Sequence, residues 1–136
     1  MTQHRHQVRI YYEDTDVSGM VYHANYLKYF ERAREHFIGP EELVRLFEEE
    51  DTAFVVYKAE LTYKEGAKLG DELEIRSRVE AESKYRAIFH QNVHRKGHEA
   101  TMVEGRVELV CVNHQQNLVP LPQSVVDSIA KLQASA

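Results

Sequence analysis

The sequence predicts an α+β domain in which one long helix lies along the concave face of a five-stranded antiparallel sheet. Three observations lead to this fold class. An aromatic-rich segment near the N-terminus shows helical spacing of its apolar residues. Beyond residue 52, four long segments alternate apolar and polar residues with the period of two that strands show. The 136 residues match the usual size of one domain, so we expect residues 1–136 to form a single unit.

The overall composition favours a soluble, cytoplasmic protein and argues against two functional classes. The formal net charge is −5, whereas a nucleic-acid-binding protein normally carries a basic excess. No apolar run approaches the roughly 20 residues that would span a membrane, and the polar N-terminal residues do not resemble a signal peptide. The single cysteine cannot form an internal disulfide, so nothing indicates an oxidising compartment.

The N-terminal part predicts a strand, a loop and the long helix. Val8, Ile10 and Tyr12 share one face of an alternating stretch, as they would in a strand. Helical spacing then runs over about residues 24–38 and stops at Gly39-Pro40, a strong stop signal. On the apolar face of this helix we expect Tyr26, Leu27, Tyr29, Phe30, Ala33 and Phe37.

Two further helices are expected to be shorter. One begins at Pro40, because proline is favourable at the first helical position, and its spacing turns Leu43, Leu46 and Phe47 inward. The other follows Leu121-Pro122 near the C-terminus. Its apolar residues are Val125, Ile129 and Leu132.

Four strands make up the rest of the predicted sheet. They cover about residues 57–64, 73–80, 85–94 and 103–111. In the first of them we expect Tyr57 and Ala59 on the apolar face, and Lys96-Gly97 later forms a tight hairpin turn. Each strand has one apolar and one largely polar face, as an antiparallel sheet covered on one side requires. Because a small sheet has exposed edge strands, we expect pairing with further subunits in a homodimer or homotetramer.

Two acidic residues lie in the loop between the first strand and the long helix. Asp14 and Asp16 precede a helix whose first amides have no intrahelical partner, and such a helix start attracts anions and can stabilise an oxyanion. Turn formation or helix capping by these residues is the simpler interpretation and stays open. A calcium-binding loop is rejected, because Asn25 stands where an EF-hand needs a bidentate Glu and a strand precedes the loop.

The histidines and the cysteine do not form a metal or nucleophile motif. His90, His94 and His98 are evenly spaced, but four residues of a strand span about 13 Å, which is too far for shared ligation. Cys111 lies in the middle of a strand and is expected to be an inert core residue. His23, at the start of the long helix, is open to a structural role or to contact with a substrate. We therefore expect no metal and no prosthetic group.

The sequence around this loop combines several unusual residues at fixed offsets. It contains Tyr11-Tyr12-Glu13-Asp14-Thr15-Asp16, then Gly19, then Val21-Tyr22-His23-Ala24-Asn25-Tyr26, and the helix continues with Phe30-Glu31-Arg32-Ala33-Arg34. This pattern closely resembles the hotdog-fold acyl-CoA thioesterases, specifically the 4-hydroxybenzoyl-CoA thioesterase-like group that includes the Tol–Pal-associated thioesterases. Leu69-Gly70-Asp71 and Val119-Pro120-Leu121-Pro122 extend the resemblance to about residues 7–122. The hotdog fold, a sheet wrapped around a long helix, agrees with the periodicity.

The resemblance implies that an acyl-CoA thioester is hydrolysed to a free carboxylic acid and coenzyme A. It assigns the catalytic carboxylate to Asp16, as nucleophile or as general base. It places the oxyanion hole at the start of the long helix, where the backbone N–H of His23 points at the thioester carbonyl and the His23 side chain helps to orient it. Tyr22, Lys84 and Arg86 are the residues expected to contact the substrate, the two basic ones through the phosphates of coenzyme A.

Several alternatives remain at this point. The substrate could instead be an acyl group on an acyl carrier protein, or the chain could be a non-catalytic acyl-thioester binding protein with the same fold. A hotdog dehydratase is disfavoured, because that group uses a His/Glu site and this loop presents Asp16. Ser18 stands where many relatives carry a second glycine, which leaves the acyl preference open.

Overall fold

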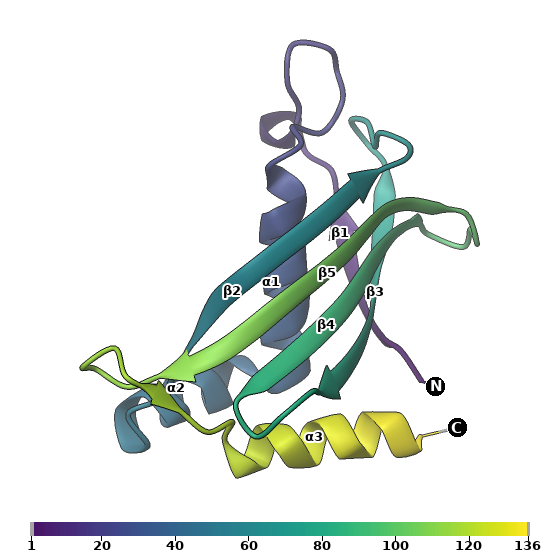
Figure 1. The fold of residues 1–136 in the computed structure, drawn as a ribbon. Helices are drawn as coiled ribbons and strands as arrows, with labels where there is room; N and C mark the ends of the chain where they lie inside the picture. Colours follow the sequence, from purple (N-terminus) through teal and green to yellow (C-terminus); the bar gives the residue numbers. More distant parts are fainter. Residues whose placement is uncertain (1, 136) are drawn as a thin grey trace.

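In the computed structural model, which describes residues 2–135, a curved antiparallel sheet wraps around one long helix (Figure 1). The helices and strands follow one another as β1 (His4–Arg9), a short 3-10 helix (Tyr12–Asp14), α1 (Asn25–Ile38), α2 (Pro40–Glu49), β2 (Ala53–Tyr63), β3 (Glu72–Ala81), β4 (Arg86–Arg95), β5 (Thr101–Val112), β6 (Leu118–Val119) and α3 (Gln123–Ala134). Among these helices none is long and apolar enough to cross a membrane.

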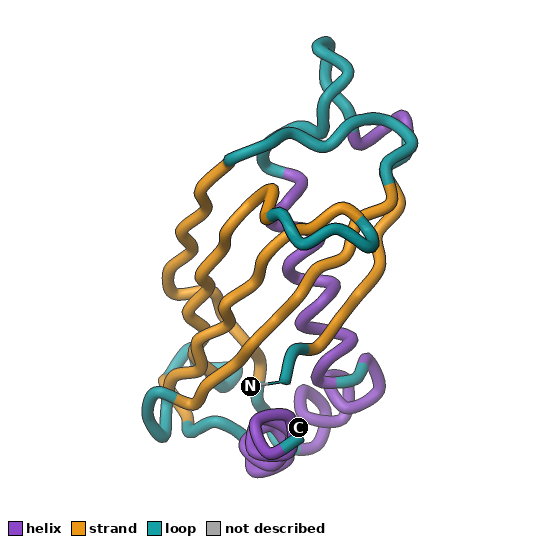
Figure 2. The backbone as a smooth tube through the Cα atoms, turned by 90° about the vertical axis from the view of Figure 1, so that its right-hand side faces the viewer, coloured by secondary structure: helices purple, strands orange, loops and turns teal. Residues whose placement is uncertain are grey.

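The sheet has the order β1-β3-β4-β5-β2, and every neighbouring pair is antiparallel. The two-residue strand β6 adds to β5, so the predicted five-stranded sheet is confirmed with one short addition. Figure 2 shows the strands curving around α1. Strands β1 and β2 are the two edges of the described sheet.

The core lies between α1 and the inner face of the sheet. α1 buries four apolar side chains at helical spacing, Tyr26, Tyr29, Phe30 and Ala33. Across from them, the alternate residues of the strands are buried as the period of two predicts, among them Ile75, Val79, Phe89, Val93, Val103 and Val107. Cys111 is fully buried there, and burial raises the pKa of its thiol to about 12, which agrees with an inert core residue.

The junction between α1 and α2 follows the predicted stop signal. Gly39 has a φ of 103°, a value that favours glycine, and its N–H donates to the carbonyl of Glu35 at 2.7 Å. Pro40 is the first residue of α2, as expected. Leu46 is fully buried, but Phe47 is 67% exposed, so its predicted inward position is wrong. Phe47 instead borders a cavity that residues of α1, α2 and β2 line.

Two residues predicted on apolar strand faces lie elsewhere. A β-bulge between Val56 and Lys58 shifts the register of β2, and Tyr57 is 63% exposed on the outer face, where its ring centroid is 4.6 Å from the guanidinium carbon of Arg86. Strand β1 ends at Arg9, and Tyr12 begins the 3-10 helix with 82% of its side chain exposed. In both cases an irregular backbone interrupts the alternation that the sequence suggests.

Candidate active site

The loop between β1 and α1 extends from one end of the sheet (Figure 1, purple). The connection between β2 and β3 supports it. Val21 donates its N–H to the carbonyl of Ala67 at 2.8 Å, and Met20 forms an isolated β-bridge with Lys68. A further bridge within the loop joins Thr15 to Val21. The segment that carries Asp16 is therefore held at both of its ends.

Asp16 lies at a tight turn inside this loop. Its N–H donates to the carbonyl of Met20 at 2.8 Å, and its own carbonyl accepts the N–H of Gly19 at 3.0 Å. The carboxylate oxygen Oδ1 accepts the N–H of Ser18 at 2.9 Å and also the Ser18 hydroxyl. The hydrogen bonds from Ser18 lower the pKa of the Asp16 carboxyl, with a smaller contribution from nearby His23. Asp16 is thus an ionised, exposed carboxylate at neutral pH.

The start of α1 presents amides that are not used within the helix. Asn25 donates its N–H to the carbonyl of Tyr22 at 2.9 Å, which closes a turn around His23 and Ala24. Within residues 2–135, the N–H groups of His23 and Ala24 have no hydrogen-bond acceptor. Ala24 also provides no side-chain cap at the helix start. These donors are therefore free to bind an oxygen that carries negative charge.

Aromatic side chains surround this turn. The His23 ring lies 4.5 Å from the Tyr22 ring and 6.3 Å from the Tyr63 ring, measured between centroids. The Tyr63 hydroxyl donates to the carbonyl of His23 at 3.1 Å. That carbonyl belongs to the same peptide group as the N–H of Ala24, so Tyr63 fixes the orientation of one of the free amides.

The structure brings Asp16, His23 and Tyr22 together at one end of the molecule. Both Asp16 and His23 are exposed, and the cavities between α1, α2 and β2 are lined by other residues. In a single chain these groups therefore face open solvent, and the cleft between them that a thioester would need is not closed.

Lys84 and Arg86 lie at the opposite end of the same chain. β1 and β3 are antiparallel with Arg9 opposite Glu72, so the Asp16 loop lies at the start of β3, whereas Lys84 follows the end of β3. Arg86 is also engaged, because it stacks on Tyr57 and its Nη1 lies 3.2 Å from the buried carboxylate of Glu108. Within one chain, these two basic residues cannot share a ligand site with Asp16.

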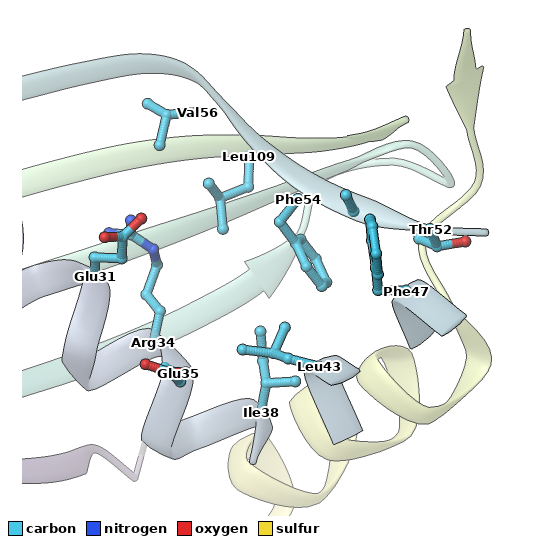
Figure 3. A pocket seen from close by; sticks show the side chains of 11 residues that line it. Glu31, Arg34, Glu35, Ile38, Leu43, Phe47, Thr52, Phe54, Val56 and Leu109 are labelled. Atoms are coloured by element: carbon cyan, nitrogen blue, oxygen red, sulfur yellow. The ribbon is translucent and has the colours of Figure 1, made fainter. Parts of the chain in front are cut away.

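A groove lies between α1 and the edge strand β2, and two adjoining cavities of about 410 and 280 Å³ form it. The cavities share Glu31, Arg34 and Val56. The smaller one begins at Leu27, in the first turn of α1, and the larger one ends against α2. The apolar wall of the larger cavity comprises Ile38, Leu43, Phe47, Phe54, Val56 and Leu109 (Figure 3).

Arg34 brings a buried cation to this groove. It is only 7% exposed, and its Nη1 donates to Oε1 of Gln91 at 3.0 Å. Gln91 is fully buried and donates in turn to the carbonyl of Phe30 at 3.1 Å. Burial lowers the pKa of Arg34 to about 10, while the negative charge of Glu31 acts in the opposite direction. Arg34 therefore remains a cation at neutral pH, anchored to the core by an amide.

Three residues of this region had no role assigned to them from the sequence. Tyr63 resembles any aromatic residue of a half-buried strand, and its contact with His23 joins segments 40 residues apart. Arg34 lies at a helix position that polarity alone assigns to the surface. The side chain of Asn25 was the one with a usable signal, because an Asn at a helix start is a common source of side-chain hydrogen bonds.

Comparisons with known proteins agree with this architecture. Residues 10–129 match the family model of the thioesterase-like superfamily. A relative from Escherichia coli O6:H1, named acyl-CoA thioester hydrolase YbgC, is 36% identical over 132 residues, which cover 92% of this chain and 94% of the relative. An acyl-CoA thioesterase YbgC from Helicobacter pylori is 42% identical over 86 residues, and the match spans 63% of each chain, slightly less than two thirds.

Solved structures show the same fold. A probable thioesterase from Bartonella henselae superimposes with a TM-score of 0.75 at 32% identity, covering 90% of this chain and 100% of that one. A 1,4-dihydroxy-2-naphthoyl-CoA thioesterase from Synechocystis superimposes with a TM-score of 0.88 at 21% identity, covering 98% and 99%. The second likeness concerns the fold alone. The sheet wrapped around α1 is thus the hotdog fold, and the chain belongs to the thioesterase-like superfamily.

Proposed function

We propose that this chain hydrolyses acyl-CoA thioesters and that Asp16 is its catalytic carboxylate. The observation that carries the proposal is that one short loop contains both an ionised carboxylate and the free amides of a helix start. The names of the relatives support the reaction class, since proteins at 36–42% identity are called acyl-CoA thioesterases or thioester hydrolases.

The chemistry needs no group beyond the chain, the substrate and water. As a nucleophile, the free oxygen of Asp16 attacks the thioester carbon, the C–S bond breaks, and coenzyme A leaves as a thiolate that takes up a proton. Water then cleaves the resulting mixed anhydride and restores Asp16. As a general base, Asp16 instead takes a proton from the water that attacks the same carbon, the C–S bond breaks, and the proton passes to the departing thiolate of coenzyme A. Both routes give one carboxylic acid and one molecule of coenzyme A.

Both routes also develop negative charge on the thioester oxygen. The N–H groups of His23 and Ala24 would donate to this oxyanion, and the partial positive charge of the α1 N-terminus adds to their effect. Such donors favour the transition state over the ground state because the charge appears only during the reaction. The side chains of His23 and Tyr22 flank the same position and would orient the carbonyl.

A second copy of the chain would complete the site. Strand β2 is an eleven-residue edge, and Val55, Val56 and Tyr63 are each at least 40% exposed along it. Pairing of β2 with a second β2 would satisfy this edge and cover the groove along α1, which would receive the acyl group. Lys84 and Arg86 would then contact coenzyme A in another subunit. A dimer or tetramer and a cytoplasmic location remain predictions, and the molecular mass in solution tests the first.

The central test is Asp16→Asn assayed over short, long and aromatic acyl-CoAs. General acid–base or nucleophilic groups typically contribute about 10²–10⁴-fold, so we expect kcat to fall at least a hundredfold with the oligomeric state unchanged. Asp127→Asn, at an exposed position of α3, is the matched control and should keep wild-type turnover. Near wild-type hydrolysis by Asp16→Asn would refute the assignment.

Two further measurements separate this proposal from the alternatives, an acyl-carrier-protein thioesterase and a non-catalytic binding protein. Competition between acyl-CoA and acyl-carrier-protein thioesters of one acyl group reports which carrier is preferred. Tight binding of acyl-CoA by the wild-type protein without any turnover would instead identify a binding protein.

A further inference from the structure

We infer that the carbonyl of Asp14 and the side chain of Asn25 form a clamp that positions Asp16 against the free amides of the α1 start. This inference rests on the proposed function, because it assigns a role to two residues that do not touch the reacting atoms. Asp14 and Asn25 are thus positioning residues. The inference concerns the backbone carbonyl of Asp14, not its carboxylate.

The clamp consists of two hydrogen bonds to one oxygen. The Asp14 carbonyl accepts the N–H of Tyr22 at 2.9 Å and the side-chain amide of Asn25, through Nδ2, at 3.0 Å. A carbonyl can only accept, so the NH₂ group of Asn25 must face it. Asn25 therefore acts as a donor here, whereas helix capping requires a side-chain acceptor.

The two donors are the two ends of the turn that carries the oxyanion amides. Tyr22 and Asn25 are joined by their own hydrogen bond of 2.9 Å, and His23 and Ala24 lie between them. Because both ends are bonded to one carbonyl, the turn cannot rotate about either end. The N–H groups of His23 and Ala24 thus keep a fixed direction without being consumed by a partner.

The acceptor is itself held firmly. The N–H of Asp14 donates to the carbonyl of Tyr11 at 3.0 Å, and its carboxylate oxygen Oδ2 accepts the Tyr11 N–H at 2.8 Å. Burial, and then the neighbouring Asp14 carboxylate, raise the pKa of Tyr29. The Tyr29 hydroxyl makes no hydrogen bond of normal geometry within residues 2–135. The hydrogen bond of the Asp14 carboxylate is therefore the one from the Tyr11 N–H, and it stabilises the turn. This agrees with the interpretation of Asp14 as a turn-forming residue.

Only one residue separates the clamp from the catalytic carboxylate. Asp16 follows Asp14 by two positions, and its N–H is bonded to Met20 on the returning side of the loop. A displacement of the turn relative to Asp14 would hence change the distance between the Asp16 carboxylate and the amide of His23. A misplacement of about 1 Å can cost roughly a hundredfold in rate.

The experiment compares Asn25→Ala and Asn25→Leu with the wild-type enzyme. Leucine keeps the approximate size of the side chain and removes the donor. We expect either variant to lower kcat by tenfold or more while KM changes less than twofold, because the clamp acts on the reacting geometry and not on coenzyme A binding. The acidic limb of the pH–rate profile should stay in place, since the contacts between Ser18 and Asp16 are retained.

Asn113→Ala is the matched control for a purely structural effect. The Asn113 side chain accepts the N–H groups of Gln115 and Asn117, each at 3.0 Å, in a turn outside the loop that carries Asp16. Its loss should lower the thermal unfolding temperature about as much as Asn25→Ala does and leave kcat unchanged. If Asn25→Ala does not fold, Asn25→Leu provides the same comparison.

Two results would overturn the inference in different ways. If both Asn25 variants retain kcat within twofold while Asp16→Asn is inactive, the clamp is wrong and the proposed function stands. The inference also fails if the rate loss is matched by an equal loss in Asn113→Ala. If Asp16→Asn itself is active, the proposed function fails, and the positioning role falls with it.

Discussion

Gly105 sets how closely α1 approaches the sheet, and Gly105→Ala is the sharpest test of that packing. A Cβ at this position would lie 2.5 Å from Cε2 of Phe30 and 2.9 Å from the carbonyl oxygen of Gln91. Restoring an ordinary contact of 3.4 Å requires a shift of about 0.9 Å by Phe30 or by α1 as a whole. Overpacking of this kind costs about 1–3 kcal/mol. For a chain of this size, the unfolding temperature should fall by roughly 3–15 °C.

The assay is thermal unfolding of Gly105→Ala beside Gly66→Ala. A Cβ at Gly66 would meet Cε of Met20 at 2.4 Å, but that atom is the end of a flexible side chain that can move away, so we expect a loss below about 1 kcal/mol. Adding Phe30→Leu to Gly105→Ala should recover part of the loss. A loss of ~1 kcal/mol corresponds to several degrees of unfolding temperature. If Gly105→Ala unfolds within about 1 °C of the wild type, α1 does not pack as closely against the sheet at Gly105 as described.

Two pH-dependent effects follow from the described contacts. Ser18→Ala removes the hydroxyl that contributes most to the lowered pKa of Asp16, so that pKa rises and the acidic limb of kcat/KM should move to higher pH. Val17→Ala, at a fully exposed neighbour, should leave the limb in place. Burial, and then the stacked ring of His36, lower the pKa of His6 below its ordinary 6.5. The unfolding free energy should therefore hold above pH 6.5 and fall below it, by at most about 1.4 kcal/mol per pH unit and proton. His36→Gln should make this decline shallower in denaturant titrations, and an unchanged slope would contradict the assignment.

The sequence predicted the parts of the fold that depend on local signals. The α1 helix was expected over about residues 24–38 and spans Asn25–Ile38, because its apolar spacing and the Gly39-Pro40 stop are both local. The candidate site was accessible for the same reason. Asp16, Tyr22 and His23 lie within eight consecutive residues, so the chain itself keeps them close.

Features that depend on distant segments were not accessible. The bulge at Tyr57 lies at the end of a run of five apolar residues without glycine or proline, so the sequence carried no sign that the alternation would break. The groove draws residues from α1, α2, β2 and β5, and its shape appears only once these elements pack. Lys84 was expected near the substrate only through the resemblance, and its place in the sequence does not reveal at which end of the sheet the following strand begins.

The loop shows how a helix start can be kept open for a ligand and still be well ordered. A side-chain cap would stabilise α1 by about 1 kcal/mol, but its oxygen would occupy the amides that an oxyanion needs. Ala24 provides no such cap, and the turn is held instead through the N–H of Tyr22 and the side chain of Asn25, both bonded to Asp14. These bonds use groups at the two ends of the turn and leave its centre unpaired. The burial of Tyr26, Tyr29 and Phe30 against the sheet then supplies the stability that the missing cap does not.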